Sequence, residues 1–262
     1  MLSLAVFATL TILCLAAPLL APYQLDAIDL ANLRRPPSRG HWLGTDDLGR
    51  DVLSRMLFGG RISIAIGLLA ALVGTGLGTL VGATAGFFGK RLDNVLMRLT
   101  DVAYAIPTLP LLIVLSAYSN AALLSMVLII GGLSWMATAR VVRAEVLTIR
   151  EMAYVEAARA LGAGSGSMIL RHTIPNVVGP LIVGATLAVG NAIVIESSLS
   201  FLGLGVQPPV PTWGNMLMDS QATMATKPWL TIFPGAAILL VVLAVNFIGD
   251  GLRDALDPKL QG

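Results

Sequence analysis

Charged residues are scarce in this chain of 262 residues, and histidine and cysteine are nearly absent. Only 12% of the residues are Asp, Glu, Lys or Arg, whereas 56% are hydrophobic and the mean hydropathy is +0.82. Soluble domains carry about 25% charged residues, so this composition is typical of a protein that crosses a membrane several times. The hydropathy leads us to expect membrane lipid as a partner. Because the 17 basic residues nearly balance the 15 acidic ones, we expect no nucleic acid as a partner.

Residues that carry catalytic or metal chemistry are missing from the patterns that such chemistry needs. His41 and His172 lie far apart and Cys14 is the single cysteine, which leaves no metal-ligand cluster and no intrachain disulfide. No Gly-x-x-x-x-Gly-Lys-Ser/Thr segment occurs, so the chain has no phosphate loop of its own. Nor is there a Ser-His-Asp, paired-carboxylate or His-Glu-x-x-His arrangement. We therefore expect no enzyme activity, no bound cofactor and no metal site in this chain.

Long uncharged runs mark the predicted membrane spans, because about 20 apolar residues are needed to cross a bilayer. The first run lacks the basic start of a secretory signal peptide, so it is interpreted as a retained anchor. The runs predict an all-α polytopic membrane protein with six transmembrane helices in one permease-like domain over 1–262, at residues 2–21, 62–89, 94–116, 121–139, 177–200 and 230–249.

The positions of Lys and Arg between these spans give only a weak indication of how the chain is oriented in the membrane. Ten basic residues lie on one side and seven on the other, and six of those seven lie in the loop 22–61, which also holds five aspartates. The bias favours cytoplasmic termini. Loops 22–61 and 201–229 are then outside, and the polar region 140–176 is cytoplasmic.

The most polar part of that cytoplasmic region is a short predicted helix that ends at Gly162. It contains good helix formers, with Tyr154, Ala158 and Leu161 at i, i+4 and i+7. Pro175 can begin the next helix without losing a needed donor. The alternative to a docking helix is an ordinary amphipathic loop.

The sequence Glu-Ala-Ala, three residues, then Gly, and after a gap of twelve residues Pro, resembles the EAA motif of permease subunits in ATP-binding-cassette (ABC) importers. The resemblance implies a coupling helix that sits in a groove of the ATPase, although His172 and Ile174 depart from the pattern. The coupling residues that it implies are Tyr154, Glu156, Ala157, Ala158, Arg159, Leu161 and Gly162.

The first outer loop carries a second distinctive sequence, His-Trp-Leu-Gly-Thr-Asp-Asp-Leu-Gly-Arg-Asp-Val-Leu-Ser-Arg, at 41–55. Thr45 or Asp46 is expected to cap a helix that lies along the membrane surface before the second span. The segment closely resembles the signature ahead of the second span in one of the two permeases, the C-type subunit, of dipeptide, oligopeptide and nickel importers. Further matches lie at 200–205, 211–216 and 249–258.

This resemblance implies a type I importer in the inner membrane of a prokaryote. Its expected partners are a second, homologous permease, two ATPase subunits that bind ATP and Mg, and an extracytoplasmic binding protein. Short peptides are the expected cargo, and nickel is the alternative. A different class, a secondary transporter with Glu196 as an ion-coupled site, would need inverted repeats, and no duplicated segment is found.

Several residues are candidates for the transport pathway or for outer contacts. Pro107 and Pro110 should kink the third span and free backbone carbonyls. Glu196, near the outer end of the fifth span, faces either a cavity or the membrane interface. The stiff outer loop contains the candidates for contact with a binding protein, which are Pro208, Pro211 and Trp213.

A row of small residues recurs every fourth position in the second span. Such a row lets another helix approach closely, and intrachain packing is favoured over a dimer interface. The row consists of Ala70, Gly74, Gly78, Gly82 and Gly86.

Overall fold

The computed structural model describes residues 1–120 and 122–256, apart from the side chains of Arg159, Ser165, Leu170 and His172. Every regular element in these residues is a helix, and the one ladder-type contact is an isolated bridge between Thr45 and Asp51. The elements, in chain order, are α1 (Leu2–Leu15), α2 (Ala17–Leu20), η1 (Leu30–Asn32), α3 (Val52–Phe88), α4 (Lys90–Ala105), α5 (Thr108–Tyr118), α6 (Leu123–Gly132), α7 (Trp135–Ile149), α8 (Ala153–Ala160), α9 (Ser165–Ser167), the π-helix η2 (Met168–Thr173), α10 (Ile174–Phe201), α11 (Trp213–Ser220), η3 (Gln221–Thr223) and α12 (Trp229–Leu256).

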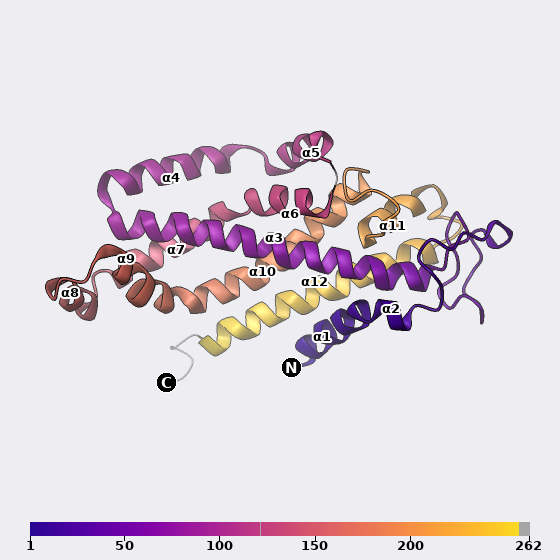
Figure 1. Ribbon diagram of the computed structural model, residues 1–262, viewed down its shortest axis with the longest axis horizontal. Coiled ribbons are helices and arrows are strands. Elements are labelled where there is room, and N and C mark those ends of the chain that lie inside the picture. The colour runs from indigo at the N-terminus through magenta and orange to yellow at the C-terminus, as the bar shows by residue number, and fades with distance from the viewer. Residues whose placement is uncertain (121, 257–262) are drawn as a thin grey trace.

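The helices form an elongated bundle (Figure 1). Helix α3 runs along most of its length, with α10 and α12 beside it, while α4 and α5 lie along one edge. One end of the bundle carries α8 and α9, and the opposite end carries α11 and the loop that precedes α3. This end-to-end separation places the two distinctive sequence segments at opposite ends of the molecule.

Helix α3 begins ten residues before the predicted span. Its N-cap is Asp51, whose carboxylate accepts a hydrogen bond from the Ser54 backbone N–H at 2.8 Å. The predicted cap at Thr45 or Asp46 and the predicted surface helix are therefore wrong. Residues 52–61 are the first turns of α3 and continue straight into its membrane-spanning part. The Asp51 side chain satisfies a free backbone N–H group of the first turn.

The small-residue row packs within the chain, as favoured from the sequence. A Cβ atom at Gly78 would lie 2.6 Å from the Trp135 carbonyl oxygen, and one at Gly82 would lie 2.9 Å from the Val142 Cβ. A side chain at these positions would clash with α7, so the row lets the backbones of α3 and α7 approach closely.

The third and fourth predicted spans are both bent. Helices α4 and α5 meet at 82°, and α6 and α7 meet at 45°. The first bend lies at Ile106, whose backbone is extended (φ −76°, ψ 125°), because a residue before proline disfavours the helical region. The kink expected from Pro107 is thus confirmed, although the predicted single helix 94–116 is two helices.

The other predicted spans differ mainly at their ends. The first is interrupted at Ala16, which separates α1 from a short helix that has a proline in its first turn. The fifth begins at Ile174 with Pro175 in its first turn, as predicted. Three helices, α3, α10 and α12, are long and apolar enough to cross a membrane, and the two bent pairs raise that number to five among the described residues.

Candidate functional site

A groove of about 460 Å³ opens between the bent α4–α5 pair and the helices α7 and α10. Tyr104 of α4 and Thr108 of α5 line it on either side of the bend. Pro180 and Gly184 line it from α10. The bend between α4 and α5 therefore lies at the wall of the groove.

Polar side chains lie in this groove inside otherwise apolar helices. Asn191 of α10 is exposed, and Ser134 and Thr138 are half-buried. An exposed amide in a membrane-spanning helix is costly in lipid, so by default it faces protein or water. The groove is accordingly the best candidate in the described residues for one wall of a polar passage.

Two ion pairs fasten α4 to α7. Arg143 donates hydrogen bonds from Nε and Nη2 to both carboxylate oxygens of Asp93, at 2.5 and 2.6 Å. Arg140 pairs with Asp101 at 2.9 Å, and its guanidinium lies 4.6 Å from the centre of the Tyr104 ring. The bidentate Arg143–Asp93 contact fixes geometry as well as distance, so it holds α4 in place against α7.

Glu196 is fully buried (0% exposed) and lies among hydroxyl groups. Its carboxylate accepts hydrogen bonds from Ser200 at 2.7 Å, from Ser63 at 3.2 Å and from Ser197 at 3.4 Å. Ser63 belongs to α3 and the other two to α10, so the carboxylate joins these helices near the end of the bundle that carries α11 and the loop before α3. This end is termed the outer end after the predicted orientation. Glu196 does not line the groove, and its predicted role in the pathway stays a prediction.

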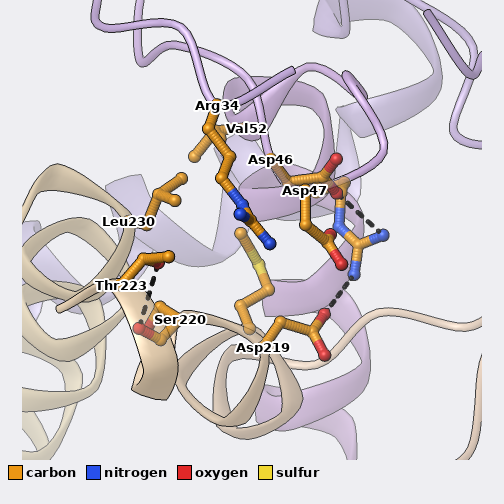
Figure 2. Close-up of a pocket in the computed structure, with 10 residues that line it drawn as sticks. Arg34, Asp46, Asp47, Val52, Asp219, Ser220, Thr223 and Leu230 are labelled. Carbon is orange, nitrogen blue, oxygen red and sulfur yellow. Dashed lines mark hydrogen bonds and ion pairs between the residues drawn. The ribbon is translucent and has the colours of Figure 1, made fainter. Parts of the chain in front are cut away.

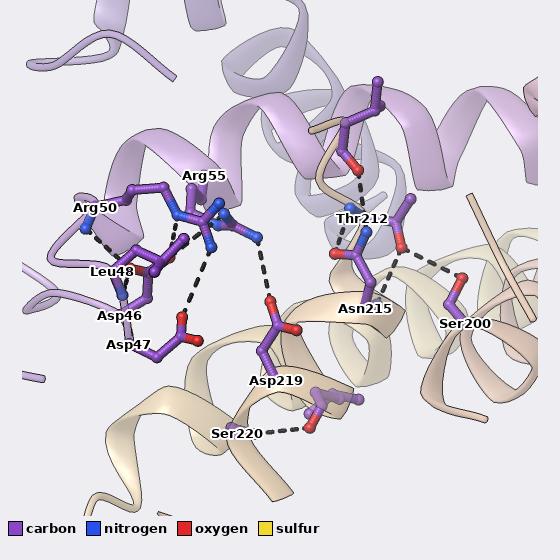
Figure 3. Close-up of polar contacts among 12 residues, drawn as sticks. Asp46, Asp47, Leu48, Arg50, Arg55, Ser200, Thr212, Asn215, Asp219 and Ser220 are labelled. Carbon is purple, nitrogen blue, oxygen red and sulfur yellow. Dashed lines mark hydrogen bonds and ion pairs between the residues drawn. The ribbon is translucent and has the colours of Figure 1, made fainter. Parts of the chain in front are cut away.

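The segment 211–216 closes the outer end of the same polar cluster. Thr212 and Asn215 form a reciprocal capping box at the start of α11. The Trp213 side chain is 1% exposed, its indole N–H donates to the Met56 carbonyl at 3.0 Å, and its backbone N–H donates to Ser63. Residues of α3, α10 and α11 are thereby joined in one hydrogen-bonded unit, part of which is shown in Figure 3.

Charged residues tie the first outer loop to α11. The Asp46 carboxylate accepts hydrogen bonds from the backbone N–H groups of Leu48 and Arg50, both at 2.9 Å, and from Arg50 Nε at 2.7 Å. Arg55 bridges Asp46 and Asp219, each at 3.4 Å (Figure 3). Burial raises the pKa of Asp219, and the guanidinium of Arg55 opposes that rise.

The same charged residues surround a small pocket at the outer end. Arg34 points into it, opposite the aspartates of the loop and of α11 (Figure 2). The pocket is a packing gap between the loop 22–51 and α11, since its accessible volume of about 20 Å³ fits one water molecule.

At the opposite end, helix α8 presents most of its side chains to solvent. Leu161 is 89% exposed and Tyr154 is 42% exposed, while Glu156 and Ala157 are also exposed and Ala158 is half-buried. Among the described side chains of α8, Val155 is the one that is fully buried, in a cluster with residues of α3 and α7. Most of the other described side chains are exposed.

Gly162 ends this helix as predicted. Its φ of +85° lies in the left-handed region, and the Ala163 N–H bonds to the Ala158 carbonyl at 3.1 Å. This pattern is a Schellman-type termination, for which glycine is the preferred residue. The Arg159 side chain, a predicted coupling residue, lies outside the described residues.

Comparison with known proteins assigns the chain to a family. The family model described as "Binding-protein-dependent transport system inner membrane component" matches residues 78–262, and the model "N-terminal TM domain of oligopeptide transport permease C" matches residues 1–37. The chain belongs to the binding-protein-dependent permease family.

Individual relatives of this permease align over most of their length. A putative peptide permease protein of Brucella suis is 45% identical over 249 residues, which is 94% of this chain and 82% of that protein. The oligopeptide transport system permease protein OppC of Bacillus subtilis is 38% identical over 261 residues, or 100% and 86%. The glutathione transport system permease protein GsiD of Pectobacterium atrosepticum is 43% identical over 246 residues, or 94% and 82%. The predicted resemblance to C-type peptide permeases is thus confirmed.

Two of the three residues predicted to face a binding protein do not face outward in this permease. Trp213 and Pro211 are buried, because the indole ring and the capping box fill the space between α3 and α10. Pro208 is exposed. The prediction mistook an aromatic, proline-rich segment for a surface when its side chains are part of the core.

Pro107 and Pro110 lie exposed at the bend between α4 and α5, and neither lines the groove. Their connection to the groove is indirect, since the bend positions the neighbouring Thr108, which does line the groove. The groove residue Asn191 was missed, although a sequence signal existed: it is the only amide in the predicted span 177–200. The terminal match at 249–258 continues α12 as far as Leu256, and its last two residues lie outside the described part.

Proposed function

We propose that this permease forms, with a second and homologous permease, the translocation pathway of an ATP-driven importer for short peptides. Two ATPase subunits that bind ATP and Mg drive it, and an extracytoplasmic binding protein delivers the cargo. Its relatives are named for peptides, for oligopeptides and for glutathione, which is a tripeptide. These names support a short peptide as the cargo.

The observation that carries the proposal is the exposed helix α8. Among its described side chains only Val155 is fully buried, while Tyr154 and the following Leu161 are exposed, so the helix is suited to enter a groove of another protein. In the proposed mechanism, ATP closes the ATPase dimer, α8 moves with it, and the bundle changes from inward-open to outward-open. Such a two-state shift requires α8 to bind differently to the two ATPase states.

The proposed topology has six spans, with both termini in the cytoplasm of a prokaryote. Each bent helix pair then counts as one span, and α1 with α2 provides the sixth. Helix α1 is 14 residues long, or about 21 Å, so α2 is needed to complete the crossing. Under this orientation, α8 is cytoplasmic and the loop 22–51 is outside.

The groove beside α10 is the proposed wall of the pathway. Its open side is expected to meet the second permease, so that the polar side chains of Asn191, Ser134 and Thr138 line a closed passage. A peptide backbone carries one donor and one acceptor per residue, and these amide and hydroxyl groups can exchange hydrogen bonds with it. The groove therefore suits a cargo that varies in side chain.

Nickel import by the same type of complex is the alternative cargo. The described residues contain no group of three His, Cys, Asp or Glu side chains placed to hold a metal ion, but specificity in such a system resides in the binding protein. An ion-coupled secondary transporter would need Glu196 to exchange ions. Because this carboxylate is enclosed by three serine hydroxyls, nothing in its surroundings favours that function.

The proposal is tested by purifying the tagged permease from gently solubilised membranes and identifying the proteins that remain bound. We expect a second permease and ATPase subunits, and uptake of peptide in vesicles that requires ATP. Glu156→Lys and Gly162→Pro should abolish uptake while membrane insertion stays intact. Recovery of the chain alone, with uptake driven by an ion gradient, would contradict the proposal. A co-purified binding protein that binds nickel and no peptide would change only the cargo.

A further inference from the structure

The acidic and basic side chains of helix α4 lie on different sides of the helix. Its two acids, Asp93 and Asp101, face α7 and pair with Arg143 and Arg140. Its three bases, Lys90, Arg91 and Arg98, are exposed and have no ion-pair or hydrogen-bond partner among the described residues. The surface that α4 turns away from the bundle is therefore purely basic.

Apolar side chains separate these bases on the outward surface. Val95 and Val102 alternate with Arg91 and Arg98 along one stripe of the helix, and Leu92 and Leu99 flank it. All four apolar residues are exposed, by 44–65%. A shallow, open hollow lies within this surface, lined by Asn94, Val95, Arg98, Leu99 and Val102. An apolar hollow beside unpaired guanidinium groups suits an amphiphile with an anionic head.

The depth of this surface places it at an edge of the membrane. The uncharged part of α3 begins after Arg61, and about 20 residues, or about 30 Å, cross the hydrocarbon core. The core then ends near Gly82, which contacts Arg143 of α7. Helix α4 turns back from the end of α3. Arg98 lies about 12 Å from the start of α4, which brings it to about the level of Gly82 on α3. Arg98 and Arg91 are thus at the height of lipid headgroups.

We propose that the outward surface of α4 binds an anionic phospholipid of the cytoplasmic leaflet. Arg91 and Arg98 contact the phosphate of the headgroup, and an acyl chain lies in the hollow along Leu99 and Val102. Arginine forks match phosphate oxygens, and basic groups at this depth attract anionic lipid. Because α4 forms one wall of the groove, the bound lipid braces that wall from outside. The assignment to the cytoplasmic leaflet rests on the proposed orientation; the binding itself does not.

The experiment compares lipid retention in the intact permease and in Arg91→Gln/Arg98→Gln. Each is purified with the subunits that accompany it, in nanodiscs that mix phosphatidylcholine with the anionic lipid phosphatidylglycerol. The lipid that stays bound is counted by native mass spectrometry after release from the nanodisc. We expect the double variant to retain about tenfold less phosphatidylglycerol, with an unchanged melting temperature because neither side chain has a partner in the fold. Arg91→Lys/Arg98→Lys should recover most of the retention. The matched control is Arg35→Gln/Arg39→Gln in the outer loop, which removes the same charge and should retain phosphatidylglycerol normally.

Three results would overturn the proposal. The first is equal retention of phosphatidylglycerol by the double variant and the intact permease. The second is displacement of the lipid by millimolar inorganic phosphate, which would identify a simple anion site. The third is loss of the second permease from the double variant, which would identify this surface as a subunit interface. Lipid retention is read without any transport, so a failure of the proposed importer function would leave this test intact. Labelling of Asn94→Cys from one side of the membrane locates the leaflet.

Discussion

The two ends of the bundle are built in opposite ways. At the outer end, the loop before α3, α11 and the ends of α3 and α10 are joined by buried polar contacts around Glu196, Thr212 and Arg55. At the other end, Val155 is the one fully buried residue among the described side chains of α8. Glu196, Thr212 and Arg55 each have specific buried partners at the outer end, and such contacts are costly to break.

This difference separates a fixed end from an adaptable end. A network of buried hydrogen bonds specifies one arrangement, whereas an exposed helix with few contacts opens or shifts at low cost. We infer that conformational change in this permease is driven at the α8 end, and that the outer network keeps the ends of α3, α10 and α11 together as one body while the bundle moves.

The largest expected effect comes from Trp213→Ala at the fixed end. The variant removes a buried indole and its hydrogen bond to Met56, and such truncations cost about 3–5 kcal/mol of unfolding free energy. The melting temperature of the purified permease should fall by several degrees or more. Trp42→Ala is the matched control, because Trp42 is 72% exposed in the same outer region. Equal melting temperatures for the two variants would show that the outer network is not a source of stability.

The converse effect is expected from Leu161→Ala at the adaptable end. Because Leu161 is 89% exposed, its truncation should leave the melting temperature unchanged. Uptake should nevertheless fall by about 10- to 100-fold, within the usual range of coupling between sites. The measurement is ATP-driven peptide uptake in vesicles, with Leu239→Ala on the exposed side of α12 as the control. Normal uptake in Leu161→Ala would mean that α8 docks through other residues.

Asp51→Ala tests whether the start of α3 contributes to the fixed end. The variant removes two hydrogen bonds with Ser54, one of which is the N-cap, and one with His41. Loss of a cap costs about 0.5–2 kcal/mol, so we expect a smaller fall in melting temperature than for Trp213→Ala. Asp26→Ala, an exposed change in the same loop, should have no effect. A loss as large as that of Trp213→Ala would show that the cap and the tryptophan are coupled.

The smallest effect is expected from Asn191→Ala in the groove, between the two ends. The amide is exposed and is not part of the core, so stability should not change. Loss of one hydrogen bond to a passing peptide, worth about 0.5–1.5 kcal/mol, should lower uptake by a factor of about 2 to 13. The rate of uptake at saturating peptide is the quantity to compare, with Gln24→Ala, an exposed amide in the loop before α3, as the control. An unchanged rate would remove Asn191 from the proposed pathway.

Local features of the sequence predicted much of this structure correctly. The helix at 153–160 and its end at Gly162 were predicted from helix formers followed by glycine, and the bend at Pro107 from a single ring. The small-residue row was assigned correctly to packing within the chain. These features depend on backbone propensity and side-chain size, and both are properties of the residue itself, independent of its tertiary contacts.

Other features depend on contacts between distant residues and were not predicted. Trp213 was assigned to the surface because a proline-rich segment around an aromatic ring is typical of a docking loop, and the pairs Asp93–Arg143 and Arg55–Asp219 join residues 50 and 164 positions apart. The start of α3 at Val52 was missed because Thr45 and Asp46 are as suitable for capping as Asp51. Which of the three residues caps the helix depends on how the loop before α3 folds.

By itself, the sequence determined that this protein is a helical membrane permease with a short polar helix between two spans, since hydropathy, glycine, proline and recognisable motifs are local properties. Only the tertiary structure decided which polar residues are buried together, where the groove opens and which surface of α4 is left without partners. The physical reason is that burial and pairing belong to a whole arrangement of helices, because each carboxylate or guanidinium takes whatever partner the packing brings within reach.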